Sequence, residues 1–226
     1  MTAHPLDRPI WSALSGRHAH FRLGTPLALR YRPQISPFAA SRDDSPAALA
    51  ALAALASPNG HLVLLAAGRI AMPPNMLVDR QAAGVQMVAG NLRAVQADER
   101  IVELGEADAA EMLALATLTE PGPFLAETHR FGGFIGIRID GRLAAMAGER
   151  LKPDGHCEVS GVCTHPDFRG RGLAGLLSAV VANRIAARGE IPFLHAYAAN
   201  AGAIRLYETL GFRVRAEVSV VVLRSA

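Results

Sequence analysis

Alternating hydrophobic and polar positions mark a segment in the second half of the chain, and turn signals link it to two further expected strands. In the first segment, Ile135, Ile137 and Ile139 fall on one face of an expected half-buried β-strand. Two turn signals, Asp140-Gly141 and Pro153-Asp154-Gly155, separate the segments. The three expected strands are residues 134–139, 142–151 and 157–164. Together they predict an antiparallel meander in this part of the chain.

Helical spacing of apolar residues appears on both sides of the meander. After it, Leu173, Leu177 and Val181 recur on one face, and Gly189 can end the helix in the left-handed conformation. The expected helices are residues 47–56, 108–118, 173–188 and 201–210. The remaining expected strands are residues 61–67, 85–88, 101–104, 192–197 and 212–223, with a turn at Pro58-Asn59-Gly60. This order predicts a mixed α/β domain over residues 98–226, preceded by an α/β lobe over residues 1–97.

The composition is that of a globular protein. Half of the 226 residues are hydrophobic and 19% are charged, which excludes a disordered chain. The longest apolar run, residues 47–56, is too short to span a bilayer. The amino terminus shows no basic segment followed by an apolar stretch, so no signal peptide is expected. We therefore expect a soluble cytoplasmic protein without a membrane partner.

The net charge of +3 comes mainly from arginine, since Lys152 is the only lysine among 23 basic residues. The arginines are scattered along the chain without a long basic run, so we expect no nucleic-acid partner. Arg169 and Arg171 flank a glycine, which favours a local anion site instead.

Cysteine and histidine spacing gives no sign of a metal site. Cys157 and Cys163 lie six residues apart in one expected strand, which is too far for a disulfide. Neither belongs to a Cys/His set with zinc spacing, and His18 and His20 lack a third ligand nearby in the sequence. We expect two buried free thiols and no metal.

The segment between residues 157 and 188 combines a strand, a glycine-containing loop and a helix. Gly170 and Gly172 let the backbone approach an anion closely, and the first free N–H groups of the helix would point at it. This arrangement predicts phosphate or diphosphate binding.

Two motifs overlap in this loop. Residues 170–175 fit G-x-G-x-x-G, the dinucleotide fingerprint. That fingerprint needs a strand running straight into the first glycine, whereas residues 164–169 intervene here. It also needs an acid at the end of the next strand, and Glu190 comes before that strand. The context therefore disfavours a nicotinamide-dependent oxidoreductase and leaves the second motif, R-x-x-G-x-A at residues 169–174.

With this second motif the chain resembles the GCN5-related N-acetyltransferase (GNAT) superfamily over about residues 98–226. The matching residues are Val162–Pro166 before the loop, Arg169-x-x-Gly172-x-Ala174 within it, and Asn200-x-x-Ala203-x-x-x-Tyr207-x-x-x-Gly211-Phe212 after it. The resemblance implies a GNAT-type α/β fold, in which a mixed, mostly antiparallel sheet is flanked by helices. The amino-terminal lobe leaves room for a degenerate half-repeat of the same fold.

The resemblance also implies that acetyl-CoA is the cosubstrate. The residues matched to the pantetheine arm are Val162, Cys163 and Thr164, and those matched to the diphosphate are Arg169, Gly170, Arg171, Gly172, Leu173 and Ala174. Asn200 occupies a position that contacts the arm in relatives, and it can equally cap the following helix.

Two residues are candidates for proton transfer. Glu158 matches the position of a glutamate base in some relatives, and it is the only carboxylate in residues 157–164. Partial burial would raise its pKa toward a useful range, while an edge-strand or arginine-paired glutamate is the alternative. Tyr207 matches the tyrosine that protonates the CoA thiolate, with a packing role as the alternative. The amide of Val162 or Cys163 would bind the thioester oxyanion.

These assignments predict an N-acetyltransferase that moves an acetyl group from acetyl-CoA to a primary amine by direct attack. The acceptor would be a small molecule or a peptide, approached by a wall at residues 119–124, and the protein a monomer or homodimer. The alternative is an acyl-CoA-binding regulatory or interaction module without turnover. His165 is expected to be a turn residue and His195 a core or cleft residue.

Overall fold

A computed structural model of the chain describes residues 4–57, 60–96 and 98–225. An eight-stranded sheet in the order β4-β11-β5-β10-β9-β8-β7-β6 forms its centre, and a separate three-stranded sheet has the order β1-β2-β3. In the large sheet every neighbouring pair is antiparallel except β9 and β10, which are parallel. The mixed, mostly antiparallel sheet expected from the sequence is thus confirmed.

The described residues form eleven β-strands, five α-helices and several short 3-10 turns. The strands are β1 (Arg22–Gly24), β2 (Ala28–Tyr31), β3 (Ala39–Ser41), β4 (His61–Ala67), β5 (Met76–Ala89), β6 (Ile101–Glu103), β7 (Ile135–Ile139), β8 (Arg142–Glu149), β9 (His156–Thr164), β10 (Ile191–Tyr197) and β11 (Phe212–Ser225). The α-helices are α1 (Pro9–Ser15), α2 (Pro46–Ala53), α3 (Ala109–Thr119), α4 (Leu173–Ala187) and α5 (Ala201–Thr209). Short 3-10 turns include η3 (Thr128–Phe131) and η4 (Pro166–Phe168).

Periodicity located the elements of the second half to within one or two residues at most ends. The meander β7-β8-β9 forms as expected, with Asp140 and Gly141 both at positive φ in its first turn. The strand expected at residues 85–88 is in fact the 14-residue β5. Its first half is mostly exposed and has three apolar residues followed by three polar ones, so it shows no alternating pattern, yet it pairs with β11 throughout. The turn expected at Pro58-Asn59-Gly60 lies partly outside the described residues.

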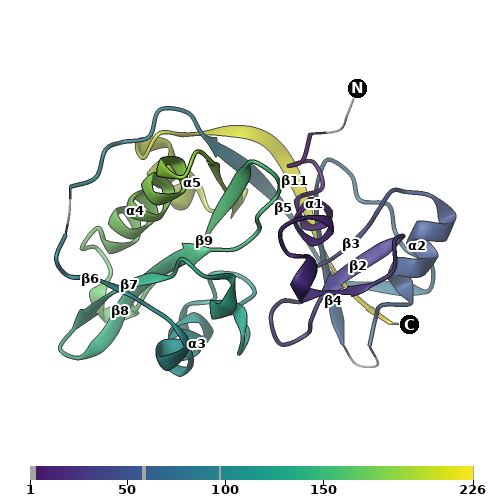
Figure 1. Cartoon of the computed structure of the whole chain (residues 1–226), viewed down its shortest axis with the longest axis horizontal. Helices are drawn as coiled ribbons and strands as arrows, with labels where there is room; N and C mark the ends of the chain where they lie inside the picture. Colours follow the sequence, from purple (N-terminus) through teal and green to yellow (C-terminus); the bar gives the residue numbers. More distant parts are fainter. Residues whose placement is uncertain (1–3, 58–59, 97, 226) are drawn as a thin grey trace.

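The large sheet continues across residue 97, where the sequence suggested a domain boundary. Strands β4 and β5 come from the first 97 residues, and β5 lies between β10 and β11 of the later part. Figure 1 shows β5 and β11 running from the part that carries α4 and α5 to the part that carries α2 and the small sheet. One apolar cluster joins Leu6 and Ile10 to Phe131 and Phe193, so the two regions share a core.

The two faces of the large sheet are covered differently. Helices α4 and α5 pack on one face, where residues such as Val159, Leu177 and Leu194 form a buried cluster. Helix α3 and the amino-terminal region cover the other face. Odd-numbered positions 157 and 159 of β9 face α4, so positions 158 and 160 face α3 and the amino-terminal region.

Strands β9 and β10 separate soon after they pair. Their ladder contains only residues 156–158 of β9 and 191–193 of β10. Beyond Glu158, β9 carries a bulge, because Gly161 and Val162 lie where the β8 partner has a single residue, Ala147. Gly161 adopts a φ of +63°, which glycine allows without strain. The result is an opening between β9 and β10, with a redirected backbone on its β9 side.

Candidate active site

The loop between β9 and α4 forms an open backbone cradle. Gly170 and Gly172 have φ of +78° and +72°, and no described atom lies within 4 Å of the place where a Cβ would stand on either. Gly172 is the N-cap of the 15-residue α4 and supplies no side-chain cap, so the first N–H groups of α4 remain free for a ligand. Arg171 lies over the Phe168 ring, 5.3 Å from its centroid. This geometry suits an anionic group.

The end of β9 carries an unsatisfied buried group beside the opening. The Thr164 hydroxyl oxygen is buried and has no hydrogen-bond partner among the described residues. Such a group is costly unless a ligand or water meets it. Cys163 is buried in the core on the α3 side, while Val162 packs against the cluster under α4. An extended ligand arm passing through the opening would fit this strand end.

The other polar residues near the loop hold local structure. The Asn200 side chain accepts a hydrogen bond from the Ala203 amide at 3.1 Å and so caps α5. His165 accepts one from the Asp167 amide at 3.2 Å, in keeping with the turn role expected for it. Cys157 and Cys163 are buried free thiols, and burial raises the pKa of Cys163 to about 11.

Glu158 is completely buried and accepts four hydrogen bonds. Arg150 donates two of them, Nε at 2.8 Å and Nη2 at 2.6 Å, to the two carboxylate oxygens. The Leu151 amide lies at 3.2 Å and His195 Nδ1 at 2.7 Å. Burial alone would raise the pKa of Glu158, but Arg150 and His195 outweigh it and lower the pKa from 4.5 to about 2. The sequence-based expectation of a raised pKa is therefore wrong.

A chain of hydrogen bonds continues from Glu158 across the sheet. The Gln86 amide nitrogen lies 3.0 Å from His195 Nε2 and also donates to the Leu6 carbonyl at 2.9 Å. The Gln86 oxygen accepts from Arg215 at 2.8 Å, which fixes the orientation of the amide. His195 Nε2 must then be the acceptor for the Gln86 amide. The ring proton therefore lies on Nδ1, which donates a hydrogen bond to Glu158.

Sequence patterns did not identify Arg150, Gln86 or Arg215 as members of this network. They come from β5, β11 and the segment after β8, which are distant in sequence. The pairing of the strands before and after residues 153–155 could have identified Arg150. In that register residue 150 lies opposite residue 158.

Tyr207 lies in α5, nearly buried, with its ring edge-on to Phe212 at a centroid distance of 6.2 Å. Burial raises the pKa of its hydroxyl to about 12, so the phenol keeps its proton at neutral pH. No hydrogen bond joins this hydroxyl to any residue of the described ranges. The proton is thus not committed to another group of the protein.

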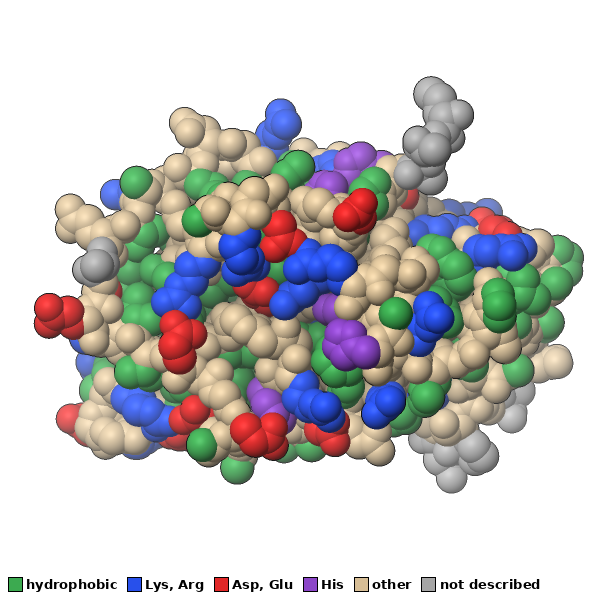
Figure 2. Space-filling model, in the orientation of Figure 1, with side chains coloured by type: hydrophobic (Ala, Val, Ile, Leu, Met, Phe, Trp, Pro, Cys, Tyr) green, Lys and Arg blue, Asp and Glu red, His purple; other side chains and the backbone are tan. Residues whose placement is uncertain are grey.

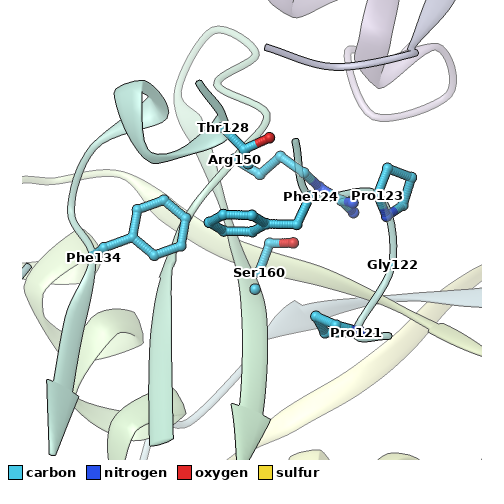
Figure 3. A pocket seen from close by; sticks show the side chains of 9 residues that line it. Pro121, Gly122, Pro123, Phe124, Thr128, Phe134, Arg150 and Ser160 are labelled. Atoms are coloured by element: carbon cyan, nitrogen blue, oxygen red, sulfur yellow. The ribbon is translucent and has the colours of Figure 1, made fainter. Parts of the chain in front are cut away.

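A small pocket lies on the α3 side of the sheet beside the β9 bulge. Its lining residues are Pro121, Gly122, Pro123, Phe124, Thr128, Phe134, Arg150, Ser160 and Gly161. The sequence predicted the loop wall at residues 119–124, and Pro121–Phe124 do line the pocket. Figure 3 shows Phe124 and Phe134 side by side, with Arg150 and Ser160 extending toward the proline loop. Phe134, Arg150 and Ser160 were not expected here.

The exposed surface around these features mixes both signs of charge. Figure 2 shows basic, acidic and histidine side chains interspersed across the face that it presents.

No group of three or more His, Cys, Asp or Glu residues within the described ranges could hold a metal ion. Nor does any helix in the described part of the chain have the length and apolar character needed to cross a membrane.

Comparisons with known proteins agree with this geometry. A family model for the FR47-like proteins matches residues 134–221. A GNAT-family structure from Novosphingobium aromaticivorans is 48% identical, with a TM-score of 0.93 over 99% of this chain and 100% of that one. A GCN5-related N-acetyltransferase from Kribbella flavida has the same fold at 22% identity, with a TM-score of 0.64 over 99% of this chain and 96% of that one.

None of the curated proteins matches the chain. The similarity to the Novosphingobium protein, however, covers the amino-terminal region as well as the loop and the opening in the sheet. This chain belongs to the GNAT family of acyltransferases.

Proposed function

We propose that the protein transfers an acetyl group from acetyl-CoA to a primary amine. The observation that carries the proposal is the combination of the open Gly170–Gly172 cradle with the gap between β9 and β10. In the proposed complex, residues 169–174 hold the diphosphate, and residues 162–164 hold the pantetheine arm. Acyl-CoA would then reach through the sheet from the α4 side to the pocket on the α3 side.

The proposed reaction is direct attack of a neutral amine on the thioester carbonyl carbon. The new C–N bond forms, the C–S bond breaks, and the departing thiolate takes the proton of the Tyr207 hydroxyl. The proton that the new amide nitrogen releases then returns to the Tyr207 oxygen through water. The amide of Val162, in the bulge, or that of Cys163, directly after it, would stabilise the oxyanion. The uncommitted proton on Tyr207 supports its role as the acid.

Glu158 fits the role of a base less well than the sequence suggested. A carboxylate that already accepts four hydrogen bonds and has a pKa of about 2 is a weak proton acceptor at neutral pH. We propose instead that Glu158 positions Arg150 and His195. The proton of the acceptor ammonium would then leave through water at the pocket mouth.

Thiol release from acetyl-CoA across a panel of primary amines tests the function. We expect release above the rate of hydrolysis with at least one class of amine, because the cradle and the opening would present the thioester to an amine on the α3 side. Tight CoA binding without release for any amine would favour the other candidate, an acyl-CoA-binding module without turnover. Calorimetric titration with CoA gives the binding measurement.

The cradle itself yields a second expectation, for Gly172→Ala. The new Cβ would project into the space proposed for the diphosphate, and losing about one charge-assisted hydrogen bond corresponds to a Kd for CoA about tenfold higher or more. Gly189→Ala is the matched control, because Gly189 also has positive φ and open space, at the other end of α4. Both variants should lose roughly 1–2 kcal/mol of stability. Equal CoA affinity in the two variants would contradict the cradle assignment.

A further inference from the structure

Arg150 uses only part of its hydrogen-bonding capacity within the protein. Its Nε and Nη2 atoms donate to Glu158, whereas Nη1 donates to no atom of the described residues. The side chain is only 12% exposed. Nη1 keeps some contact with solvent and is not one of the buried unpartnered atoms of the described residues, so it is available to donate hydrogen bonds to a ligand.

The packing around Arg150 aims the free edge into the pocket. The Phe38 ring lies 4.9 Å from the guanidinium carbon, and Glu158 occupies one in-plane edge of the group. A Cβ built on Gly122 would stand 3.9 Å from Nη1, which places that atom beside the proline loop. Figure 3 shows the guanidinium reaching toward Pro123. The edge of the guanidinium that carries Nη1 therefore faces the pocket.

Ser160 adds a second polar group on the same side. Residue 150 pairs with residue 158, and side chains two apart on a strand share a face, so Arg150, Glu158 and Ser160 all point toward α3. The Ser160 hydroxyl forms no hydrogen bond within the described part of the chain. Both unpartnered groups line one pocket whose remaining walls include Phe124 and Phe134.

These groups match the chemistry of a carboxylate. An arginine edge binds a planar two-oxygen anion with good geometry, and a serine hydroxyl can donate a further hydrogen bond. A free alkylammonium would be repelled by the guanidinium, so the reacting amine must lie elsewhere in the pocket. The walls that would contact the rest of such a ligand are apolar side chains and glycine.

We propose that Arg150 and Ser160 form a carboxylate-binding subsite, and that the acceptor is an amino acid or a similar amine that carries a carboxylate. The inference rests on the proposed acetyl transfer and names its substrate class. A carboxylate on the acyl group, as in succinyl-CoA, would present the same chemistry to Arg150. The experiment therefore separates these two sources.

The first test compares matched amines on the unmodified protein. With acetyl-CoA, kcat/KM for glycine and L-alanine should exceed that for glycinamide and L-alaninamide by about tenfold or more, the effect of about one charge-assisted hydrogen bond. Equal or better use of the amides would overturn the proposal. A preference for succinyl-CoA over acetyl-CoA with methylamine, without discrimination among acceptors, would also overturn it by moving the carboxylate to the donor.

The second test uses one variant of each subsite residue. Arg150→Lys retains a cation beside Glu158 but removes the planar guanidinium that can bind two oxygens at once. Ser160→Ala removes only the hydroxyl. Each should raise the KM for glycine about tenfold more than it raises the KM for glycinamide. Arg188→Lys is the matched control, since Arg188 donates to the buried Glu149 at 2.7 Å outside the pocket. Equal changes for glycine and glycinamide would show a merely structural role.

Direct binding distinguishes failure of this subsite from failure of the proposed function. Calorimetry of the CoA-loaded protein should show that N-acetylglycine binds about tenfold more tightly than N-acetylglycinamide, and that Arg150→Lys abolishes the difference. If no amine is acetylated but this difference persists, the catalytic proposal fails and the subsite stands. If amines are acetylated but the two N-acetyl compounds bind alike, the subsite fails alone.

Discussion

Replacing Tyr207 with phenylalanine is expected to lower kcat for acetyl transfer about 100-fold or more, the usual contribution of a positioned proton donor. The phenol carries its proton at neutral pH, burial raises its pKa further from 10.0 to about 12, and no described residue accepts a hydrogen bond from it. Removing the hydroxyl would leave the CoA thiolate to depart unprotonated. Steady-state thiol release with saturating acetyl-CoA and amine measures the effect.

The Tyr207 variant should fold normally. Phenylalanine retains the ring that packs edge-on against Phe212. Tyr197→Phe is the matched control, because Tyr197 is 47% exposed at the end of β10. Thermal unfolding should be similar for both variants and the unmodified protein. If Tyr207→Phe retained full kcat, Tyr207 would be a packing residue and another group would protonate the thiolate.

Replacing Glu158 with alanine is expected to lower the free energy of unfolding by about 3–5 kcal/mol. The change leaves Arg150 buried without its carboxylate and removes the acceptor for the His195 Nδ1 proton. Equilibrium unfolding in urea measures the loss. Glu208→Ala is the control, since Glu208 is exposed on α5 and an exposed substitution changes stability by about 0.5 kcal/mol or less. A loss for Glu158→Ala no greater than for Glu208→Ala would contradict the buried ion pair.

The same ion pair gives the stability a defined dependence on pH. The folded-state pKa of Glu158, about 2, lies below its ordinary value of 4.5, so the unfolded state binds the proton more readily. The contribution is fully present above about pH 4.5 and is lost as pH falls toward about 2. The difference in unfolding free energy between the unmodified protein and Glu158→Gln should therefore shrink as pH falls through this window. A base acting from Glu158 would instead produce an acid limb in kcat that Glu158→Gln removes.

Several features of this protein were determined by short stretches of sequence. The Asp140-Gly141 turn, the helix-ending Gly189 and the loop glycines 170 and 172 each adopt positive φ. Glycine, which has no Cβ, and residues with a short polar side chain adopt that conformation at a low cost in free energy. Residue type alone therefore predicts it. Periodicity likewise placed β7, β8 and β9, because one face of each strand must be apolar.

Tertiary structure decided the chemistry of the candidate site. Glu158 has a low pKa because Arg150 and His195 reach it from 8 and 37 residues away, and no local pattern fixes which charge meets a buried carboxylate. Strand β5 lies inside the sheet although the sequence indicated only residues 85–88 as a strand, because β11 pairs with all of it from a distant part of the chain. The sequence by itself therefore determined the local backbone shapes and the loop proposed to hold CoA. Only the folded chain decided what surrounds the reacting groups, because their pKa values and free hydrogen-bond donors depend on neighbours that are remote in sequence.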